Sequence, residues 1–245
     1  MLDARRRVCL EAIGIELWSR RAGDPGQLGI PAAHHPDPTL STPLVADAAP
    51  PDTGPSALDP VSDLGWDDLR TAVADCHACA RHQTRTQTVF GVGHPDADLM
   101  IIGEAPGADE DRQGEPFVGR AGQLLTAMLA AIGLRREQVY IANIIKCRPP
   151  GNRDPHSEEA ASCQAYLYRQ IELIKPRLIL SVGRVSAHKL LGTDESVGRL
   201  RGRVHRFDPG DVPLIVTYHP AYLLRRPQEK ARAWQDLQAA HRLLA

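Results

Sequence analysis

One acidic residue stands where a buried strand is expected to end, in the stretch Gly103–Gly107, which reads GEAPG. The apolar run Leu99–Ile102 before it is typical of a parallel strand covered on both faces. Open α/β sheets bind their ligands beyond the carboxyl ends of such strands, and glycine lets the backbone turn sharply there. Glu104 is therefore a candidate catalytic carboxylate, and the alternative is a tight strand exit without a chemical role.

Four of the five cysteines form a pattern that suits a metal. Cys76 and Cys79 make a C-x2-C pair, Cys147 and Cys163 follow much later, and Cys9 stands alone. Structural disulfides are rare in the cytosol, so four thiolates indicate zinc or an iron–sulfur cluster. Spacing alone favours iron–sulfur slightly, because only one pair is close, and it leaves open four unrelated buried cysteines.

The elements that must position these residues alternate between apolar strands and amphipathic helices. This alternation predicts an α/β fold, a three-layer α/β/α sandwich with a central four-stranded parallel sheet. The loops after the first, second and fourth strands then open at one edge, which brings Glu104, Asn143 and His219 together. The expected strands are 98–102, 139–145, 178–182 and 214–217, and the expected helices are 66–75, 120–132, 157–174, 184–191 and 227–243.

Composition changes abruptly along the chain of 245 residues. Residues 1–21 predict a short helix that could dock onto a protein partner. Residues 22–62 hold nine of the 20 prolines and no Lys or Arg, which predicts a disordered linker. Residues 63–245 then form the folded catalytic domain. The formal net charge of −1 does not by itself indicate a nucleic-acid partner.

Several classes of protein are excluded by hydropathy. The chain has no run of 18 apolar residues, so no transmembrane helix is expected. Its first 21 residues lack the uninterrupted apolar region of a signal peptide. We therefore expect a cytoplasmic monomer without a membrane partner.

Four motifs, read together with the cysteine spacing, resemble one family. They are GEAPG at 103–107, GEPFVGRAG at 114–122, NIIKCRPPGNR at 143–153 and HPAYLLR at 219–225. These residues are similar to the family-4 uracil-DNA glycosylases, bacterial and archaeal enzymes that carry a 4Fe–4S cluster. The resemblance covers about residues 66–245. It implies a DNA-repair enzyme that hydrolyses the N-glycosidic bond of uracil in DNA and leaves an abasic site.

The resemblance also implies the role of each cysteine and of the base-binding residues. Cys76, Cys79, Cys147 and Cys163 would ligate the cluster, which would brace the loops that face DNA. Phe117 would stack on a uracil flipped out of the helix. Asn143 both donates and accepts hydrogen bonds, which matches O4 and N3–H of uracil and rejects cytosine.

The chemical step falls to residues at the strand ends. His219 would donate a hydrogen bond to uracil O2 as negative charge develops there. Backbone N–H groups around Glu104 and Ala105 would add donors to the same oxygen. Glu104 would activate a water or stabilise the sugar cation, and the sequence does not separate these two roles. The family counterpart of Glu110 lies near uracil C5, so Glu110 is either a thymine-excluding residue or part of a solvated acidic loop.

Residues after the last motif are suited to hold DNA. Leu223 or Leu224 would fill the space left by the flipped base, and Arg225 would bind phosphate. The basic loops Arg81–Arg85 and Lys146–Arg153 are further candidates for phosphate contacts.

The residues of the motifs distinguish a glycosylase from several competing functions. A non-catalytic iron–sulfur DNA-binding module, or an electron carrier, would not need Glu104, Asn143 and His219 together. A related group traps DNA covalently through a His in an extra basic loop, and no such insertion follows Cys147. Family-5 enzymes lack the acidic residue found here at position 104.

Overall fold

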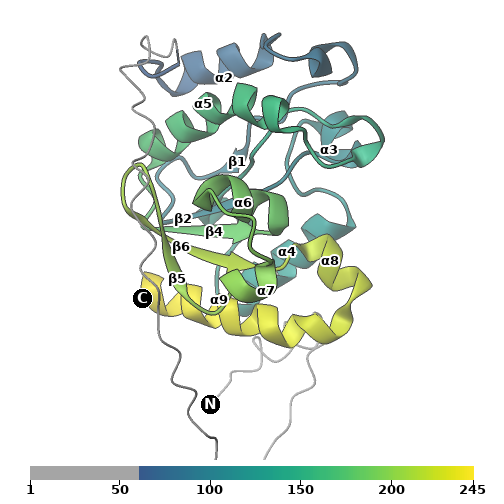
Figure 1. Cartoon of the computed structure of the whole chain (residues 1–245). Coiled ribbons are helices and arrows are strands. Elements are labelled where there is room, and N and C mark those ends of the chain that lie inside the picture. Colours follow the sequence, from purple (N-terminus) through teal and green to yellow (C-terminus); the bar gives the residue numbers. More distant parts are fainter. Residues whose placement is uncertain (1–60) are drawn as a thin grey trace, which may run out of the picture. The chain divides into compact units, whose positions relative to one another are not determined.

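The structure is a computed structural model that describes residues 61–245 (Figure 1). The expected helix within 1–21 and the expected linker at 22–62, apart from its last two residues, lie outside the described residues. Val61 is already buried against Leu69 and Val73, so the folded body includes at least two residues before the expected boundary at 63.

A six-stranded sheet forms the centre of the described region, in the order β1-β3-β2-β4-β6-β5. Strands β3, β2, β4 and β6 are mutually parallel, which confirms the expected four-stranded core. Strands β1 and β5 pair antiparallel at the two edges of the sheet. The bounds are β1 Val92–Gly93, β2 Leu99–Gly103, β3 Tyr140–Asn143, β4 Leu178–Val182, β5 Val204–Phe207 and β6 Val212–Thr217.

Helices cover both faces of the sheet, as the three-layer prediction requires (Figure 1). Alternation along β2 sends Ile101 into one apolar core and Ile102 into the other. The first core is closed by α4 (Arg120–Ala131), α8 (Pro220–Arg225) and α9 (Lys230–Leu244), and the second by α5 (Ser157–Ile174), α6 (Arg184–Leu191) and α7 (Val197–Leu200). Helix α2 (Trp66–Ala74) packs on the outer side of α5 through a smaller cluster.

Short elements appear where loops were expected. Helix α3 (Ala108–Gln113) lies in the loop after β2, α7 in the loop after α6, and α8 directly after β6. The structure also has four 3₁₀ turns, namely η1 (Ala80–Gln83), η2 (Arg136–Gln138), η3 (Pro150–Asn152) and η4 (Pro227–Glu229). Within residues 61–245, no helix is both long and apolar enough to cross a membrane.

The chain reverses its direction of travel across the sheet at β2. From β2 it moves to β3 on one side, and later it crosses to β4 on the other side. Such a switch point leaves a crevice between the loops that follow the two strands. Glu104 follows β2 and Arg184 follows β4, so both residues stand at this crevice.

Candidate active site

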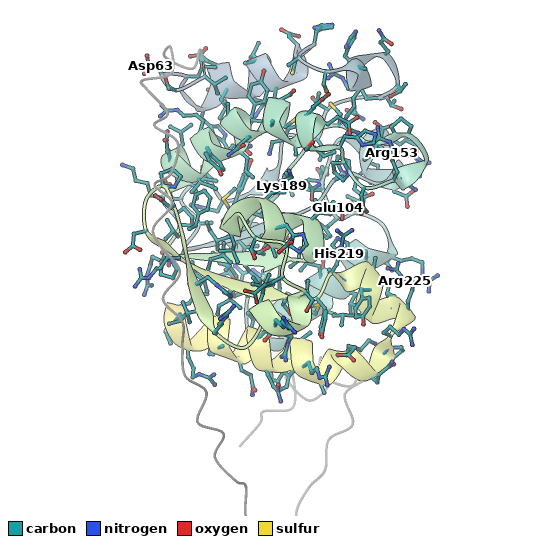
Figure 2. The ribbon with its side chains drawn as sticks, in the orientation of Figure 1. Asp63, Glu104, Arg153, Lys189, His219 and Arg225 are labelled. Carbon is teal, nitrogen blue, oxygen red and sulfur yellow. The ribbon has the colours of Figure 1, made fainter. Side chains whose placement is uncertain are left out.

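A cavity of about 840 Å³ opens at the carboxyl edge of the parallel strands. It collects seven of the predicted site residues from six separate segments, namely Glu104, Ala105, Glu110, Phe117, Asn143, His219 and Arg225. Figure 2 shows Glu104 and His219 at one edge of the molecule, with Arg153 and Arg225 along the same edge. Glu104, Asn143 and His219 therefore meet at the carboxyl edge of the parallel strands, where the sequence analysis expected them.

Asn143 is the most constrained polar side chain of this pocket. It is the last residue of β3, pairs in register with Gly103, and is 1% exposed. The backbone bond from Ile144 N to the Gly103 carbonyl, 3.0 Å, continues the pairing beyond the strand. Asn143 Oδ1 is buried and has no hydrogen-bond partner. A buried acceptor without a partner is costly, so this oxygen is suited to a ligand that brings an N–H group.

Phe117 packs against the same backbone in an unusual conformation. Its φ is 56°, and its ring is almost fully buried. Two glycines make the approach feasible. A Cβ at Gly103 would lie 2.6 Å from Phe117 Cζ, and one at Gly122 would lie 1.7 Å from the Phe117 carbonyl oxygen. A non-glycine residue held at positive φ beside a cavity is typical of a binding site.

Glu110 holds the loop that carries Phe117. One carboxylate oxygen accepts from Val118 N at 3.0 Å and Gly119 N at 3.2 Å, and the other accepts from Gly107 N at 3.1 Å. The carboxylate therefore links α3 to the residues after Phe117, which rules out the reading of Glu110 as a solvated acid. It also lines the pocket, so a contact with ligand stays a prediction.

His219 presents a defined tautomer to the cavity. It is the N-cap of α8, and its Nδ1 accepts a hydrogen bond from Ala221 N at 3.1 Å. The ring proton is therefore on Nε2. Burial, with a smaller contribution from Arg225, lowers the pKa of His219 to about 4. At neutral pH the imidazole is uncharged and offers one N–H donor.

The ring of His219 also lies close to that of Phe117. Their centroids are 5.6 Å apart and their planes are tilted by 31°. One wall of the cavity thus combines a flat apolar surface with a neutral donor. With Asn143, this wall can hold a planar heterocycle and hydrogen-bond to its edge.

Comparison with known proteins agrees with this arrangement. The sequence model of the uracil DNA glycosylase superfamily matches residues 90–238. A type-4 uracil-DNA glycosylase of Archaeoglobus fulgidus is 48% identical over 168 residues, which cover 66% of this chain and 84% of that protein. Type-4 uracil-DNA glycosylases of Pyrobaculum aerophilum and Sulfurisphaera tokodaii are 43% and 41% identical, with 69% and 71% of this chain and 89% and 83% of those proteins covered.

The chain belongs to the uracil-DNA glycosylase superfamily.

Helix α8, which follows His219, carries the three residues that were predicted to contact DNA. Leu223 is 1% exposed and packs in the core, so this structure does not present it to DNA. Leu224, the next residue of this helix, is 37% exposed. Arg225 lines the pocket, so Leu224 and Arg225 remain the candidates for DNA contact.

Two residues of the predicted phosphate-binding loops are also buried. Arg81 is 2% exposed and pairs with Glu159, and Lys146 is 1% exposed. Neither side chain reaches solvent, so both predictions of phosphate contact are wrong. Arg153 binds both oxygens of Glu159, at 2.9 and 2.8 Å, and this pairing lowers the pKa of Glu159 to about 2. Arg148 is half-exposed and stays a candidate.

The four predicted ligand cysteines form a second cluster, which we term the cysteine corner. Cys147 and Cys163 are buried, whereas Cys76 and Cys79 are half-buried. Cys147 is electrostatically coupled to Cys76 and Cys79, and Cys163 to Cys147 and Cys79, so the four thiols face a common region. In residues 61–245 no three His, Cys, Asp or Glu side chains converge tightly enough for a single metal ion.

Three basic side chains lie in or beside the cysteine corner, and burial lowers the pKa of one of them, Lys146, to about 7. Arg85 Nη1 donates to Cys147 Sγ at 3.2 Å. Buried Arg81 has no hydrogen-bond partner for Nε or Nη1. Lys146 Nζ donates to the Asn143 carbonyl at 3.1 Å and to Gln170 Oε1 at 2.6 Å. Lys146 therefore joins the backbone of the pocket asparagine to α5, the helix that holds Cys163.

The sequence reasoning missed two charged residues of the pocket, Asp154 and Arg184. Arg184 begins α6 directly after β4, so the loop after the third parallel strand should have been searched with the other three. Asp154 lies seven residues past Cys147 in an irregular loop. No local pattern marks it, because its pocket partners are distant in sequence.

Proposed function

We propose that this protein is a monofunctional uracil-DNA glycosylase, which hydrolyses the bond between uracil and deoxyribose in DNA repair. The observation that carries this proposal is the buried, unpartnered Oδ1 of Asn143 beside the Phe117 ring and the Nε2–H of His219. Uracil offers the complementary groups, namely a flat ring, an N3–H donor and two carbonyl acceptors. The relatives named above are type-4 uracil-DNA glycosylases, which agrees with this proposal.

Recognition of the base rests on the amide of Asn143. Its Oδ1 accepts from uracil N3–H, and its Nδ2 donates to O4. Cytosine carries an acceptor at N3 and a donor at C4, so it would leave both amide groups opposed and buried. Phe117 stacks on the ring face. The base must first leave the duplex, because the glycosidic bond is unreachable inside the stack.

Bond cleavage uses the neutral imidazole and the pocket carboxylate. As the C1′–N1 bond breaks, its electron pair stays with uracil, and His219 Nε2–H donates to the O2 that gains charge. The pocket needs no cation for this, since a neutral donor already fits the developing anion. Water adds to C1′, and its proton passes to Glu104, which also stabilises the positive charge on the sugar while ionised. Backbone N–H groups at Glu104 and Ala105 add donors to O2.

Contact with DNA is assigned to the exposed end of α8. Leu224 fills the space that the flipped nucleotide leaves, and Arg225 binds an adjacent phosphate. Glu110 keeps the Phe117 loop in place and stands near the ring edge at C5. No observation on the described residues favours a non-catalytic or covalently trapping function.

The test replaces Asn143, a buried asparagine of the pocket. Excision is measured on oligonucleotides with one uracil or one cytosine, with Asn143→Asp and the matched control Asn152→Asp on the rim. A protonated carboxyl at position 143 donates to cytosine N3, so Asn143→Asp should lose uracil excision and gain activity on cytosine. Asn152→Asp should keep the wild-type preference. Absence of abasic product with wild-type protein would overturn the proposal.

We further propose that the cysteine corner holds a 4Fe–4S cluster through Cys76, Cys79, Cys147 and Cys163. Each thiolate of such a cluster binds a different iron, which suits four thiols that face one region without converging on one point. The cluster and its thiolates are anionic, which suits the guanidinium groups of Arg81 and Arg85 at this position. When bound, the cluster supplies a rigid link between the η1 region, the end of β3 and α5.

The remaining assignments extend from the catalytic domain to the whole chain. We propose that residues 63–245, with Val61 and Ser62 packed onto them, catalyse excision in the cytoplasm as a monomer. Residues 22–62 serve as a linker, and residues 1–21 dock onto a protein partner. Excision by a chain that lacks residues 1–60 tests this division, because loss of activity would contradict it.

A further inference from the structure

The carboxyl group of Glu104 lies within reach of a second carboxyl group that lines the same pocket, that of Asp154. Two carboxylates cannot hydrogen-bond to each other, because each would offer only acceptors. The contact therefore requires a proton on one of the two groups. Asp154 comes from the loop after η3, between Cys147 and Cys163, while Glu104 follows β2.

Arg184 decides where this proton resides. It begins α6 across the switch point, and its Nη2 donates to Asp154 Oδ2. Arg184 is bonded to Asp154, and Glu104 is the more buried of the two carboxyl groups, so we assign the proton to Glu104. Both side chains of this ion pair are about 60% exposed, which makes their interaction modest and sensitive to salt.

The surroundings of Glu104 act in the same direction. The pKa of Glu104 is raised to about 7, chiefly by burial and then by the neighbouring charge of Asp154, while Arg184 acts in the opposite direction. The other charged or titratable groups that line the pocket are Glu110 from α3, Arg153 after η3, Tyr218 after β6, and His219, Tyr222 and Arg225 from α8 and its cap. Glu110 is committed to backbone donors and His219 is neutral, so Asp154 and Arg184 are the charges that control Glu104.

We propose that Asp154 is a positioning residue that holds a proton on Glu104, and that Arg184 sets how firmly the proton is held. This inference rests on the proposed function, which makes Glu104 the acceptor of a proton from water. A protonated Glu104 cannot accept that proton or stabilise a cation. Excision therefore requires the pair to release its proton to solvent first, and the rate rises with pH until this release is complete.

Substitution of the two controlling residues should shift the pH profile in opposite directions. Single-turnover excision, measured at saturating protein from about pH 5 to about pH 9, reports the ionisation of Glu104. Asp154→Asn removes a like charge and donates to the ionised carboxylate, so the acidic limb moves down by roughly half a pH unit. Arg184→Gln removes the nearby cation, so the limb moves up by a similar amount.

A matched ion pair at the other end of β2 provides the control. Asp98 and Arg177 are 65% and 55% exposed and lie 3.7 Å apart, far along the strand from Glu104. Asp98→Asn should leave the limb unchanged. A loss of activity from mere structural damage would lower the rate at every pH without moving the limb. The proposal is overturned if the two test variants shift the limb in the same direction or leave it in place.

A direct titration separates this inference from the proposed function. The holo-protein, free of DNA and labelled with ¹³C at glutamate carboxyls, is titrated with Glu104→Gln used to assign the Glu104 resonance. The midpoint should fall in Asp154→Asn and rise in Arg184→Gln. If the titration midpoint of Glu104 does not move in either variant, the proposed control of Glu104 by Asp154 and Arg184 is overturned, even if the protein excises uracil. Shifted midpoints without any abasic product support the pair and overturn the glycosylase proposal instead.

Discussion

The pocket and the cysteine corner both include residues at the end of β3, yet their titratable side chains differ in charge. In the pocket, His219 is neutral because its pKa is lowered to about 4, and Glu104 is largely protonated below pH 7 because its pKa is raised. In the cysteine corner, Arg85 donates to Cys147 and buried Arg81 pairs with Glu159, while burial lowers the pKa of Lys146 to about 7. Only three residues separate Asn143 from Cys147 along the chain.

This difference indicates what each region is prepared to receive. A neutral imidazole such as His219 meets negative charge only when the glycosidic bond breaks, which favours the transition state over the substrate. A cationic cluster of side chains suits a group that is already anionic before any reaction. Neighbouring regions of one fold can thus be prepared for different charges by burial and by the choice of side chains.

Loss of a cysteine should have the largest effect and tests whether the corner supports the pocket. Cys163→Ser should remove the brown absorbance near about 400 nm and the bound iron. It should also lower uracil excision by about 100-fold, because small displacements of pocket groups are costly. Cys9→Ser, which lies outside the quartet, is the control and should change neither. Iron-free Cys163→Ser with normal excision would show that the two regions are independent.

Removal of the neutral donor comes next. His219→Ala should lower kcat by about 100-fold with little change in KM, since the hydrogen bond strengthens as O2 gains charge. His219→Gln keeps an N–H group and should recover part of this loss. The acidic limb near pH 7 should persist in His219→Gln, because Glu104 is protonated below its pKa while the imidazole is already neutral. Disappearance of the limb would assign it to His219 and contradict a neutral imidazole.

The link between the two regions should give the smallest effect. Lys146→Met leaves the Asn143 carbonyl and Gln170 Oε1 without their buried donor. The free energy of unfolding, measured with denaturant, should fall by about 2 kcal/mol. Discrimination between uracil and cytosine should also weaken. Lys189→Met, on the exposed side of α6 (Figure 2), should leave both quantities unchanged. Equal effects of the two substitutions would remove Lys146 from the link.

The regular part of the fold could be predicted from sequence because its signals are local. Helix α5, strand β4 and helix α6 have the expected bounds, since apolar periodicity and a Gly or Ser boundary mark each of them. Helices α3, α7 and α8 were missed because each spans six residues or fewer. Such helices are stabilised by caps and tertiary contacts more than by periodicity.

Prediction of the site succeeded where one rule of topology applied. Parallel strands end at one edge, which grouped Glu104, Asn143 and His219 without any contact information. The choice between Leu223 and Leu224 depends on which side of a single helical turn faces the core. The sequence does not decide it, because both residues are leucine. The Asp154–Arg184 pair spans 30 residues and two loops, so only the folded structure reveals it.

The absence of a side chain at Gly103 has a consequence for the genome that such a protein guards. A methyl group there would lie 2.5 Å from Asn143 Oδ1 and 2.6 Å from the Phe117 ring, inside the space assigned to the base. Alanine at position 103 would therefore displace Asn143 or Phe117, and the protein would leave uracil in place. Deaminated cytosines would then be copied as thymine, and a lineage with this one change would accumulate C-to-T transitions.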